Sequence, residues 1–574
     1  MPPTSHDPNY LLTRLEGAKN RFGPGTAADT TKLLAQIAKL QLHDPRHLIR
    51  LHEVLLFLRA FPQSQAIVRR VEHLLNSFHE RIEKLSALHA DMSVFDDFDT
   101  SGIAGTTMQD VLSLDVAQWL VRHIPRNVEI AWEDYWDDYQ SERARANTWP
   151  RFLPLLEEDA DVEANIPWLR WLDAARGRQH ALEYLLRQFA QLPLPARQQA
   201  ELYDGLRLPV RWSLANLKLS RTRNWTRPRR FYFHDAPLLQ RSEVSLAEEL
   251  ARPAPKLEKL SLRDGESVLH TVREVMLVRY RELYGTTLGD PRSVVRADLG
   301  RGVVIHLWNL PPNRRLPLRA YVAGFTQKNG VPINYVEAIG LCEWIEVGFN
   351  TFYTYRQGET AWIYAQALRC LRALTGAKCI SVYPYQIGQN NDEAIDSGAF
   401  WFYRKLGFRS GRADLEQLAR REEQKITANP QYRTSKKILK RLAEAHVFCD
   451  LPAAAVSGPW DTFSTRSLAL RVNSRMARDF DGDSDRIRQA SVAAVTRAFK
   501  INPTRWTPTE QRALENWSLV LALISDLHRW SPQEKQDAIK IIRAQAASNE
   551  MRYLRLTQNS PRLRRELLRL GSKT

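Results

Sequence analysis

The hydrophobic pattern of this chain changes near residue 250, and that change limits the folds open to it. Up to residue 250 apolar residues recur at helical spacing. After the proline-bearing segment 251–255 they form short runs rich in β-branched and aromatic residues, separated by Gly, Pro and Asn turns. The sequence predicts strands at residues 257–263, 303–310, 317–326, 331–355 and 378–385, and helices at residues 265–284, 359–375 and 391–405.

The order of these elements predicts an α/β (α+β) fold, in which a central mixed sheet carries helices on both faces. The flanking segments show a different pattern. Leu33, Leu34 and Ile37 begin a helical stripe that later stripes repeat, and residues 413–574 have the same spacing. We therefore expect an N-terminal all-helical domain at residues 1–245, the sheet domain at residues 255–412 and a C-terminal, basic, all-helical domain at residues 413–574.

Composition narrows the class of protein. With 574 residues, 44% of them hydrophobic, the chain can form two to four domains with sizeable cores. We find no apolar run long enough for a membrane span and no secretory signal pattern, so we expect a cytoplasmic protein. The four cysteines lack the paired spacing of a structural zinc site or a disulfide framework, and no metal ligand set is predicted.

The net charge of +17 is unevenly distributed. Residues 412–574 contain 30 Lys and Arg against 18 Asp and Glu, a net charge of +12. A basic surface attracts anions, including nucleic acid and acidic proteins, but it also serves solubility. Residues 221–233, where arginines alternate with aromatics, and the Arg-rich residues 552–569 are candidates for nucleic-acid binding. The same compositions suit structural roles, so nucleic acid is an allowed partner that the sequence does not favour.

A turn that could hold a phosphate follows the β-rich run. Residues 349–354 are mostly aromatic or β-branched, Gly358 allows close backbone approach, and a helix begins soon afterwards. The first N–H groups of a helix have no partner within it, and the positive end of the helix dipole lies behind them. Such a turn has the features of a site that binds an anion such as phosphate. Its residues are Arg356, Gln357, Gly358, Glu359, Thr360 and Ala361.

A second motif lies at the end of the helix predicted at residues 391–405. Ile395, Ala399 and Phe402 form its apolar face at helical spacing, and Asn391 is a candidate cap for its first turn. The helix ends in an aromatic turn, Phe-Tyr-Arg-Lys-Leu-Gly-Phe, at residues 402–408. Taken alone, Tyr403 is better explained as a core aromatic that closes a helix end than as a functional residue.

Together the two motifs resemble the second half of a domain of the GNAT superfamily of N-acetyltransferases. That family carries Arg/Gln-x-x-Gly-x-Gly/Ala at the turn that holds the coenzyme A pyrophosphate, and further on a helix ending in Tyr-x-Lys-x-Gly-Phe. Tyr403, Lys405 and Gly407 with Phe408 match the later motif. Arg356 stands two rather than three residues before Gly358. The resemblance covers residues 300–410 and does not extend to the helical flanks.

The resemblance implies an acyl-CoA-dependent N-acyltransferase, with acetyl-CoA as the expected co-substrate and an unidentified amine as acceptor. Backbone amides of residues 357–361 would hold the pyrophosphate beside Arg356, and Asn391 would contact the pantetheine arm. Tyr403 would protonate the departing thiolate. Glu346, or less favourably Glu343, lies on the β-rich run before the turn, where the family often keeps its base; a water chain replaces that base in some members.

Two alternatives stay open from the sequence alone. Because a fold does not fix a function, the chain could be a non-catalytic scaffold with a GNAT-like domain that binds nucleic acid or an acidic protein through its basic helical flanks. Residues 479–485 alternate Asp with other residues in the manner of a calcium loop. The positions that require Gly and Glu hold Ser484 and Ala490, so an acidic helix start is the preferred interpretation.

Overall fold

The structure, a computed structural model, describes residues 7–23, 25–135, 142–154, 168–215, 217–451 and 458–572. The chain divides into two compact units. The first contains residues 1–227, 233–236 and 271–283, and the second contains residues 228–232, 237–270 and 284–574. The boundary expected near residue 412 therefore lies inside the second unit.

The first unit begins with helices packed around Leu and Phe side chains. Helix α3 is the most deeply buried of them, and Asp44 caps it by accepting the Arg46 N–H at 2.8 Å, ahead of Pro45 in the first turn. Helices α3 and α4 are joined by a short turn at Pro62. The helices are α1 (Pro8–Ala18), α2 (Thr26–Ala38), α3 (Pro45–Ala60), α4 (Gln65–Asn76) and α5 (Phe78–Ala87).

The prediction that the N-terminal segment is all-helical is wrong, because this unit contains a three-stranded antiparallel sheet. Its strands are β1 (Thr107–Val111), β2 (Val128–Ile130) and β3 (Pro209–Ser213), in the order β1-β3-β2. Trp212 is fully buried where the sheet meets the surrounding helices. Those helices are α6 (Leu114–His123), α7 (Trp132–Tyr135), α8 (Glu142–Thr148), α9 (Trp168–Arg176), α10 (Ala181–Gln191) and α11 (Ala196–Leu206).

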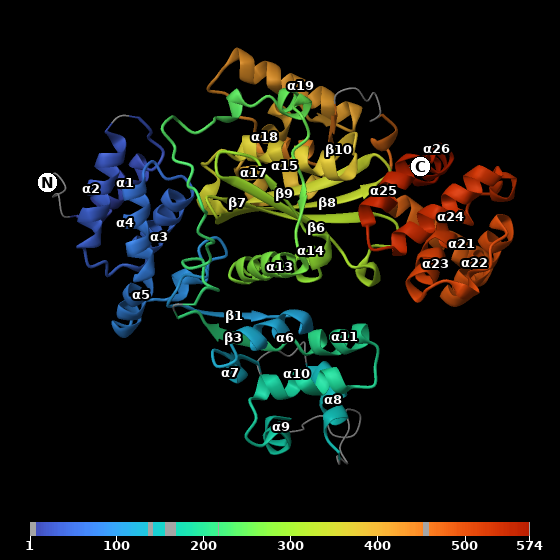
Figure 1. The fold of residues 1–574 in the computed structure, drawn as a ribbon, viewed down its shortest axis with the longest axis horizontal. Coiled ribbons are helices and arrows are strands. Elements are labelled where there is room, and N and C mark those ends of the chain that lie inside the picture. The colour runs from blue at the N-terminus through green and yellow to red at the C-terminus, as the bar shows by residue number, and fades with distance from the viewer. Residues whose placement is uncertain are drawn as a thin grey trace. The chain divides into compact units, whose positions relative to one another are not determined.

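The second unit is built on a nine-stranded mixed sheet, ordered β11-β12-β10-β9-β8-β7-β6-β5-β4. All neighbours are antiparallel except β9 and β10, which run parallel. Figure 1 shows helices on both faces, with α15 on one and α14 on the other. The strands are β4 (Glu258–Lys259), β5 (Val295–Asp298), β6 (Val303–Asn309), β7 (Ala320–Lys328), β8 (Val331–Leu341), β9 (Trp344–Thr351), β10 (Cys379–Val382), β11 (Arg409–Ser410) and β12 (Val447–Asp450).

The mixed sheet and its strand-rich runs are confirmed, with two corrections. The segment after residue 412 is not all-helical, since β12 inserts into the sheet between β10 and β11. The helix expected at residues 391–405 is divided, because Gly398 adopts a left-handed backbone with φ of 67°. Its parts are α17 (Asp392–Asp396) and α18 (Ala399–Lys405), preceded by the single-turn α16 (Pro384–Ile387).

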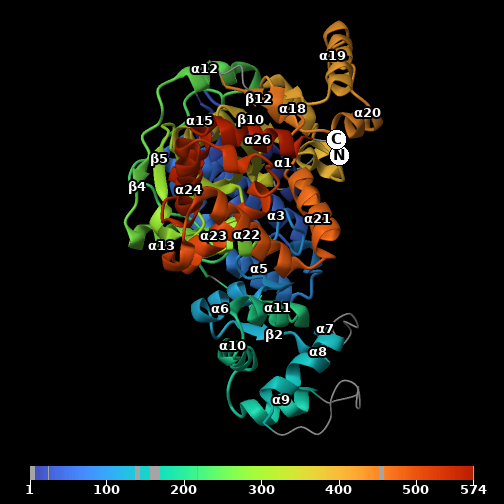
Figure 2. The same cartoon turned by 90° about the vertical axis from the view of Figure 1, so that its right-hand side faces the viewer.

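The other helices of the second unit connect and extend the sheet. Figure 2 shows α19 projecting away from the sheet, next to α20. Asp483 caps α22 by accepting two backbone N–H groups, as expected for an acidic helix start. No helix in the described part of the chain is both long and apolar enough to cross a bilayer. The bounds are α12 (Leu246–Ala251), α13 (Leu262–Leu277, shared between both units), α14 (Tyr284–Thr287), α15 (Thr360–Thr375), α19 (Ala413–Ala428), α20 (Lys436–Leu442), α21 (Thr465–Phe480), α22 (Ser484–Phe499), α23 (Pro508–Leu521), α24 (Pro532–Ala546), α25 (Glu550–Gln558) and α26 (Pro561–Gly571).

One buried histidine makes the first unit sensitive to acid. His52 of α3 is fully buried, with its Nε2 2.9 Å from the Thr222 hydroxyl, and burial lowers its pKa to about 4. The unfolded chain binds a proton at an ordinary pKa of about 6.5. Between these values the unfolded state holds more protons, so the free energy of unfolding falls as the pH drops from about 6.5 to 4, by at most about 3 kcal/mol.

We predict that His52→Gln reduces this loss of stability between pH 7 and pH 5, because the amide does not titrate. The readout is urea unfolding of the first unit, followed by pulsed hydrogen exchange of α3 peptides at one fixed labelling pH. His73→Gln, at an exposed position on α4, is the control and should keep the wild-type pH dependence. A variant at position 52 that loses as much stability as the wild type would contradict the assignment.

Candidate active site

The parallel strands β9 and β10 stay paired over only part of their lengths. Their register runs from Trp344 opposite Cys379 to Glu346 opposite Ser381. Strand β9 continues to Thr351, whereas β10 ends at Val382 and the chain turns into α16. The last residues of β9 thus pair with β8 alone among the described strands. We call the place where pairing stops, at Glu346 and Ser381, the strand fork.

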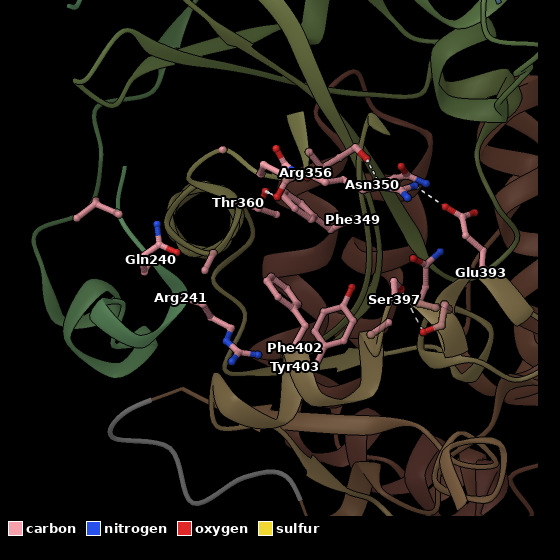
Figure 3. A pocket seen from close by; sticks show the side chains of 18 of the residues that line it. Gln240, Arg241, Phe349, Asn350, Arg356, Thr360, Glu393, Ser397, Phe402 and Tyr403 are labelled. Atoms are coloured by element: carbon pink, nitrogen blue, oxygen red, sulfur yellow. Dashed lines mark hydrogen bonds and ion pairs between the residues drawn. The ribbon is translucent and has the colours of Figure 1, made fainter. Parts of the chain in front are cut away.

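A cavity of about 590 Å³ lies beyond the fork. It is bounded by the free end of β9, the turn before α15, and the short helices α17 and α18. Figure 3 shows Phe349, Phe402 and Tyr403 facing the same space. Predicted site residues on its wall are Arg356, Gln357, Gly358, Thr360, Ala361, Asn391 and Tyr403, and the unpredicted ones include Arg241, Asn350, Gln386, Glu393 and Ser397. We call it the helix-end cavity.

The amino end of α15 opens into the helix-end cavity. Gly358 donates its N–H to the Tyr355 carbonyl at 2.8 Å, which closes a tight turn just before the helix. No side chain of the described residues caps α15, so its first amides remain available, and Thr360 and Ala361 lie on the cavity wall. The backbone of Gly358 is not left-handed. Its missing side chain therefore matters for the space it leaves at the cavity rather than for the conformation of the turn.

Glu359 has a different position from its neighbours and does not line this cavity. Its side chain is fully buried and pairs with Arg301, and with Lys328 at 3.3 Å. It also accepts the Leu239 N–H at 3.3 Å. Burial lowers the pKa of Lys328 to about 8, although the Glu359 carboxylate opposes that shift. The carboxylate therefore anchors the turn on the side that faces away from the helix-end cavity. Of Glu359, the backbone rather than the side chain is available to a ligand in that cavity.

Two further predicted residues line the cavity with their side chains already in use. The Arg356 guanidinium pairs with Glu393 of α17 and lies 5.5 Å from the ring centre of Tyr353. Asn391 caps α17, accepting the Ala394 N–H at 3.1 Å and donating to the Tyr385 carbonyl at 3.0 Å. Arg356 therefore links the α15 turn to α17, and Asn391 links α17 to α16.

Positive charge gathers at one side of the cavity. Arg241 lies on its wall, in the short helix Arg241–Glu243. The pKa of Lys405 is lowered, mainly by burial and further by the charges of Arg241 and Arg433. Lys405 is therefore close enough to each of the two arginines to be repelled by it, and of these three cations Arg241 is the one on the cavity wall. An anion placed beside them would relieve that repulsion.

Tyr403 projects from α18 into the helix-end cavity (Figure 3). Its ring packs edge-on against Tyr364, Phe402 and Phe408, at centroid distances of 5.7, 5.3 and 5.6 Å. Burial raises the pKa of its hydroxyl above the ordinary value, so the phenol stays protonated at neutral pH. No group of the described residues hydrogen-bonds this hydroxyl, which is consistent with a donor held ready for a ligand atom.

Glu346 lies at the strand fork and lines a second cavity, of about 410 Å³. Its carboxylate is 2.9 Å from Nε2 of His446 and 3.6 Å from the Arg319 guanidinium. His446 directly precedes β12, and Tyr383 at the end of β10 packs edge-on against its ring at 5.3 Å. We call this the fork cavity. The sequence prediction included Glu346 and missed His446, which comes from a segment expected to be helical.

The two cavities follow one another along the same strand. Side chains alternate on β9, so Glu346, Gly348 and Asn350 share a face. Glu346 lines the fork cavity, and Asn350 lines the helix-end cavity. Gly348 lies between them, and a Cβ added there would lie 3.7 Å from the Gln386 side-chain nitrogen. Residue 348 therefore leaves this face of β9 without a side chain between Glu346 and Asn350.

Glu343, the second predicted base, lies in neither of these cavities. Its buried carboxylate accepts hydrogen bonds from the Trp460 indole at 2.7 Å and from Arg564 at 2.6 Å. These bonds join the β8–β9 turn to the C-terminal segment. The position of Glu343 supports a structural role, which leaves Glu346 as the better-placed carboxylate.

Comparisons of the chain with protein-family models, with curated proteins and with solved structures found no match.

Proposed function

We propose that the chain is an acyl-CoA-dependent N-acyltransferase, with acetyl-CoA as the expected donor and a GNAT-like arrangement in its sheet. The observation that carries the proposal is that an uncapped helix end, α15, and the Tyr403 hydroxyl open into one cavity beyond a fork between parallel strands. The insertion of β12 between β10 and β11 supports the arrangement as well, because it places His446 at the same fork.

The residues around the helix-end cavity suit a nucleotide-linked diphosphate. Amides of the first turn of α15 supply N–H donors and the positive end of the helix dipole. Arg241 across the cavity adds positive charge, and Arg356 at the turn would do so on exchanging its partner Glu393 for the ligand. The free edge of β9 offers backbone groups for an extended amide-bearing arm beyond the fork. When bound, the acyl-CoA would supply a thioester carbonyl, whose carbon–sulfur bond breaks as the amine nitrogen bonds to carbon.

The chain's own residues would manage the protons of this transfer. Glu346, paired with His446, accepts the proton that the amine loses during attack. Tyr403 donates its hydroxyl proton to the departing sulfur and is protonated again from solvent. Both roles require the donor and the acceptor to meet near the strand fork, on the line from Asn350 to Glu346 along β9.

A non-catalytic scaffold that binds nucleic acid is less well supported. Arg221 of the arginine–aromatic segment is buried and pairs with Glu53 at 3.0 Å. In the C-terminal segment Arg562, Arg564 and Arg569 pair with carboxylates, and Arg555 donates to carbonyls at the end of α15. These arginines are used inside the fold, which weakens the argument from composition.

Gly358→Trp should reduce acetyl-CoA binding about 100-fold, a loss of about 3 kcal/mol, because the indole would occupy the cavity at the α15 turn. Gly358→Ala is the matched control. Since the backbone there is not left-handed, alanine causes no backbone strain, and this variant should bind acetyl-CoA within a few-fold of the wild type. Titration calorimetry with acetyl-CoA measures both. Wild-type affinity in the tryptophan variant would place the ligand elsewhere.

Tyr403→Phe should lower kcat by about 10²- to 10⁴-fold, the range typical of a lost general acid, without changing the affinity for acetyl-CoA. Thiol release measures the rate, and calorimetry measures the binding. Tyr432→Phe removes a phenol that hydrogen-bonds Glu422 and lines neither cavity, so it should keep the wild-type rate. An undiminished kcat in the phenylalanine variant would rule out Tyr403 as the acid.

Glu346→Gln and His446→Gln should each lower kcat by about 100-fold, because each removes one member of a hydrogen-bonded pair that accepts a proton. The double variant should be no slower than the slower single variant, since groups that act as a unit lose activity non-additively. Thiol release with a saturating amine gives all three rates. If the fold-loss of kcat in the double variant equals the product of the two single losses, the two residues act separately.

A further inference from the structure

The charged residues of the fork cavity indicate which class of amine accepts the acyl group, provided that the proposed acyl transfer is correct. We infer that the acceptor is an α-amino acid with a free carboxylate. Its amine would lie against the Glu346–His446 pair, and its carboxylate would lie against the guanidinium of Arg319.

Arg319 is the first reason. It precedes β7, and its side chain is largely buried, with 25% of it exposed. Its one ion-pair partner among the described residues is Glu346, at 3.6 Å, and no described residue forms a hydrogen bond with its guanidinium. Buried guanidinium groups are normally hydrogen-bonded, and this one faces a cavity. Its planar set of N–H donors matches a carboxylate, which can accept two parallel hydrogen bonds.

Distance is the second reason. In an α-amino acid the amine nitrogen and the carboxylate carbon are about 2.5 Å apart, as backbone bond lengths and angles require. Glu346 and Arg319 are 3.6 Å apart at their closest atoms. A molecule that presents an amine to one and an anion to the other must therefore carry both groups close together. An α-amino acid meets this condition, whereas a diamine or a peptide amino terminus lacks the neighbouring carboxylate.

The other arginines of the fork cavity differ in their partners. Arg412 is held by Asp414 at 2.7 Å and by Glu444 at 3.1 Å, so its charge is already balanced. Arg466, in the first turn of α21, donates to the Tyr383 hydroxyl at 3.1 Å and has no carboxylate partner among the described residues. Arg466 is exposed at the cavity and is the arginine there without a carboxylate partner among the described residues, whereas Arg319 has Glu346. Apolar side chains of Trp344, Phe448 and Phe463 complete the wall and favour an apolar amino-acid side chain.

The proposed step balances. The amine nitrogen attacks the thioester carbonyl carbon and forms the amide bond. The proton lost from nitrogen goes to the Glu346–His446 pair, and the carbon–sulfur bond breaks with its electron pair on sulfur. That sulfur takes the Tyr403 proton. The products are the N-acyl amino acid and free coenzyme A.

The test measures thiol release from acetyl-CoA by the full chain with the twenty L-amino acids, and then with the amide of each active one. We expect at least one apolar amino acid to be used, and its amide to have a kcat/KM lower by about 10- to 100-fold, the effect of a lost charged hydrogen bond. Arg319→Met should lower kcat/KM for the amino acid by a similar factor, mainly through KM, and leave the amide almost unaffected. Arg420→Met, on exposed α19, is the control and should change neither.

The outcomes separate this inference from the proposed function. Equal use of amino acids and their amides, or use of amines without a carboxylate only, would overturn the inference and keep the acyl transfer. Binding of acetyl-CoA without thiol release for any amino acid would also overturn it. Loss of discrimination between acid and amide in Arg319→Met alone would support it. If acetyl-CoA does not bind to the wild type, the proposed function fails and the inference fails with it.

Discussion

The site depends on the point at which two parallel strands stop pairing. If β10 followed β9 to its end, the edge of β9 beyond Glu346 would be covered and no cavity could open beside it. Pro384 makes continuation of β10 unfavourable, because a proline lacks the N–H that a central strand needs. The chain turns into α16 instead, and β9 runs on alone toward the turn before α15. Both cavities are consequences of this early ending.

A second constraint keeps the turn before α15 in place. Three charged side chains, Glu359, Arg301 and Lys328, meet behind it in a largely buried cluster. Buried ion pairs contribute little net stability against apolar replacements, but loss of one partner leaves an uncompensated buried charge. The cluster therefore contributes more to the exact position of the turn than to the free energy of unfolding. It holds the first amides of α15 at one position relative to β7, whose last residue is Lys328.

Much of the central fold could be predicted because its signals are local. The strands β6 to β9 are apolar runs closed by clear turns, and α15 has a glycine at each end, at Gly358 and Gly376. Pairing between distant segments has no such signal. Strand β12 is four residues long and reaches the sheet only after α19 and α20, so His446 could not be placed at the fork from sequence. For the same reason the sequence does not predict the pairing of β1 with β3, which lie far apart in the chain, and their segments fall within a region predicted to be helical.

The insertion of β12 has a practical meaning for anyone who divides this chain. The motifs that resemble an acetyltransferase end before residue 412. Judged from these motifs alone, a fragment that ends there would contain the whole domain. It would lack the strand that separates β10 from β11, and it would leave the β10 edge unpaired and prone to self-association. It would also lack the imidazole beside Glu346. A piece that ends at residue 450 would regain that strand, but it would still lack Phe463 and Arg466 of the fork cavity and the two partners of Glu343, so the C-terminal helices belong with the sheet.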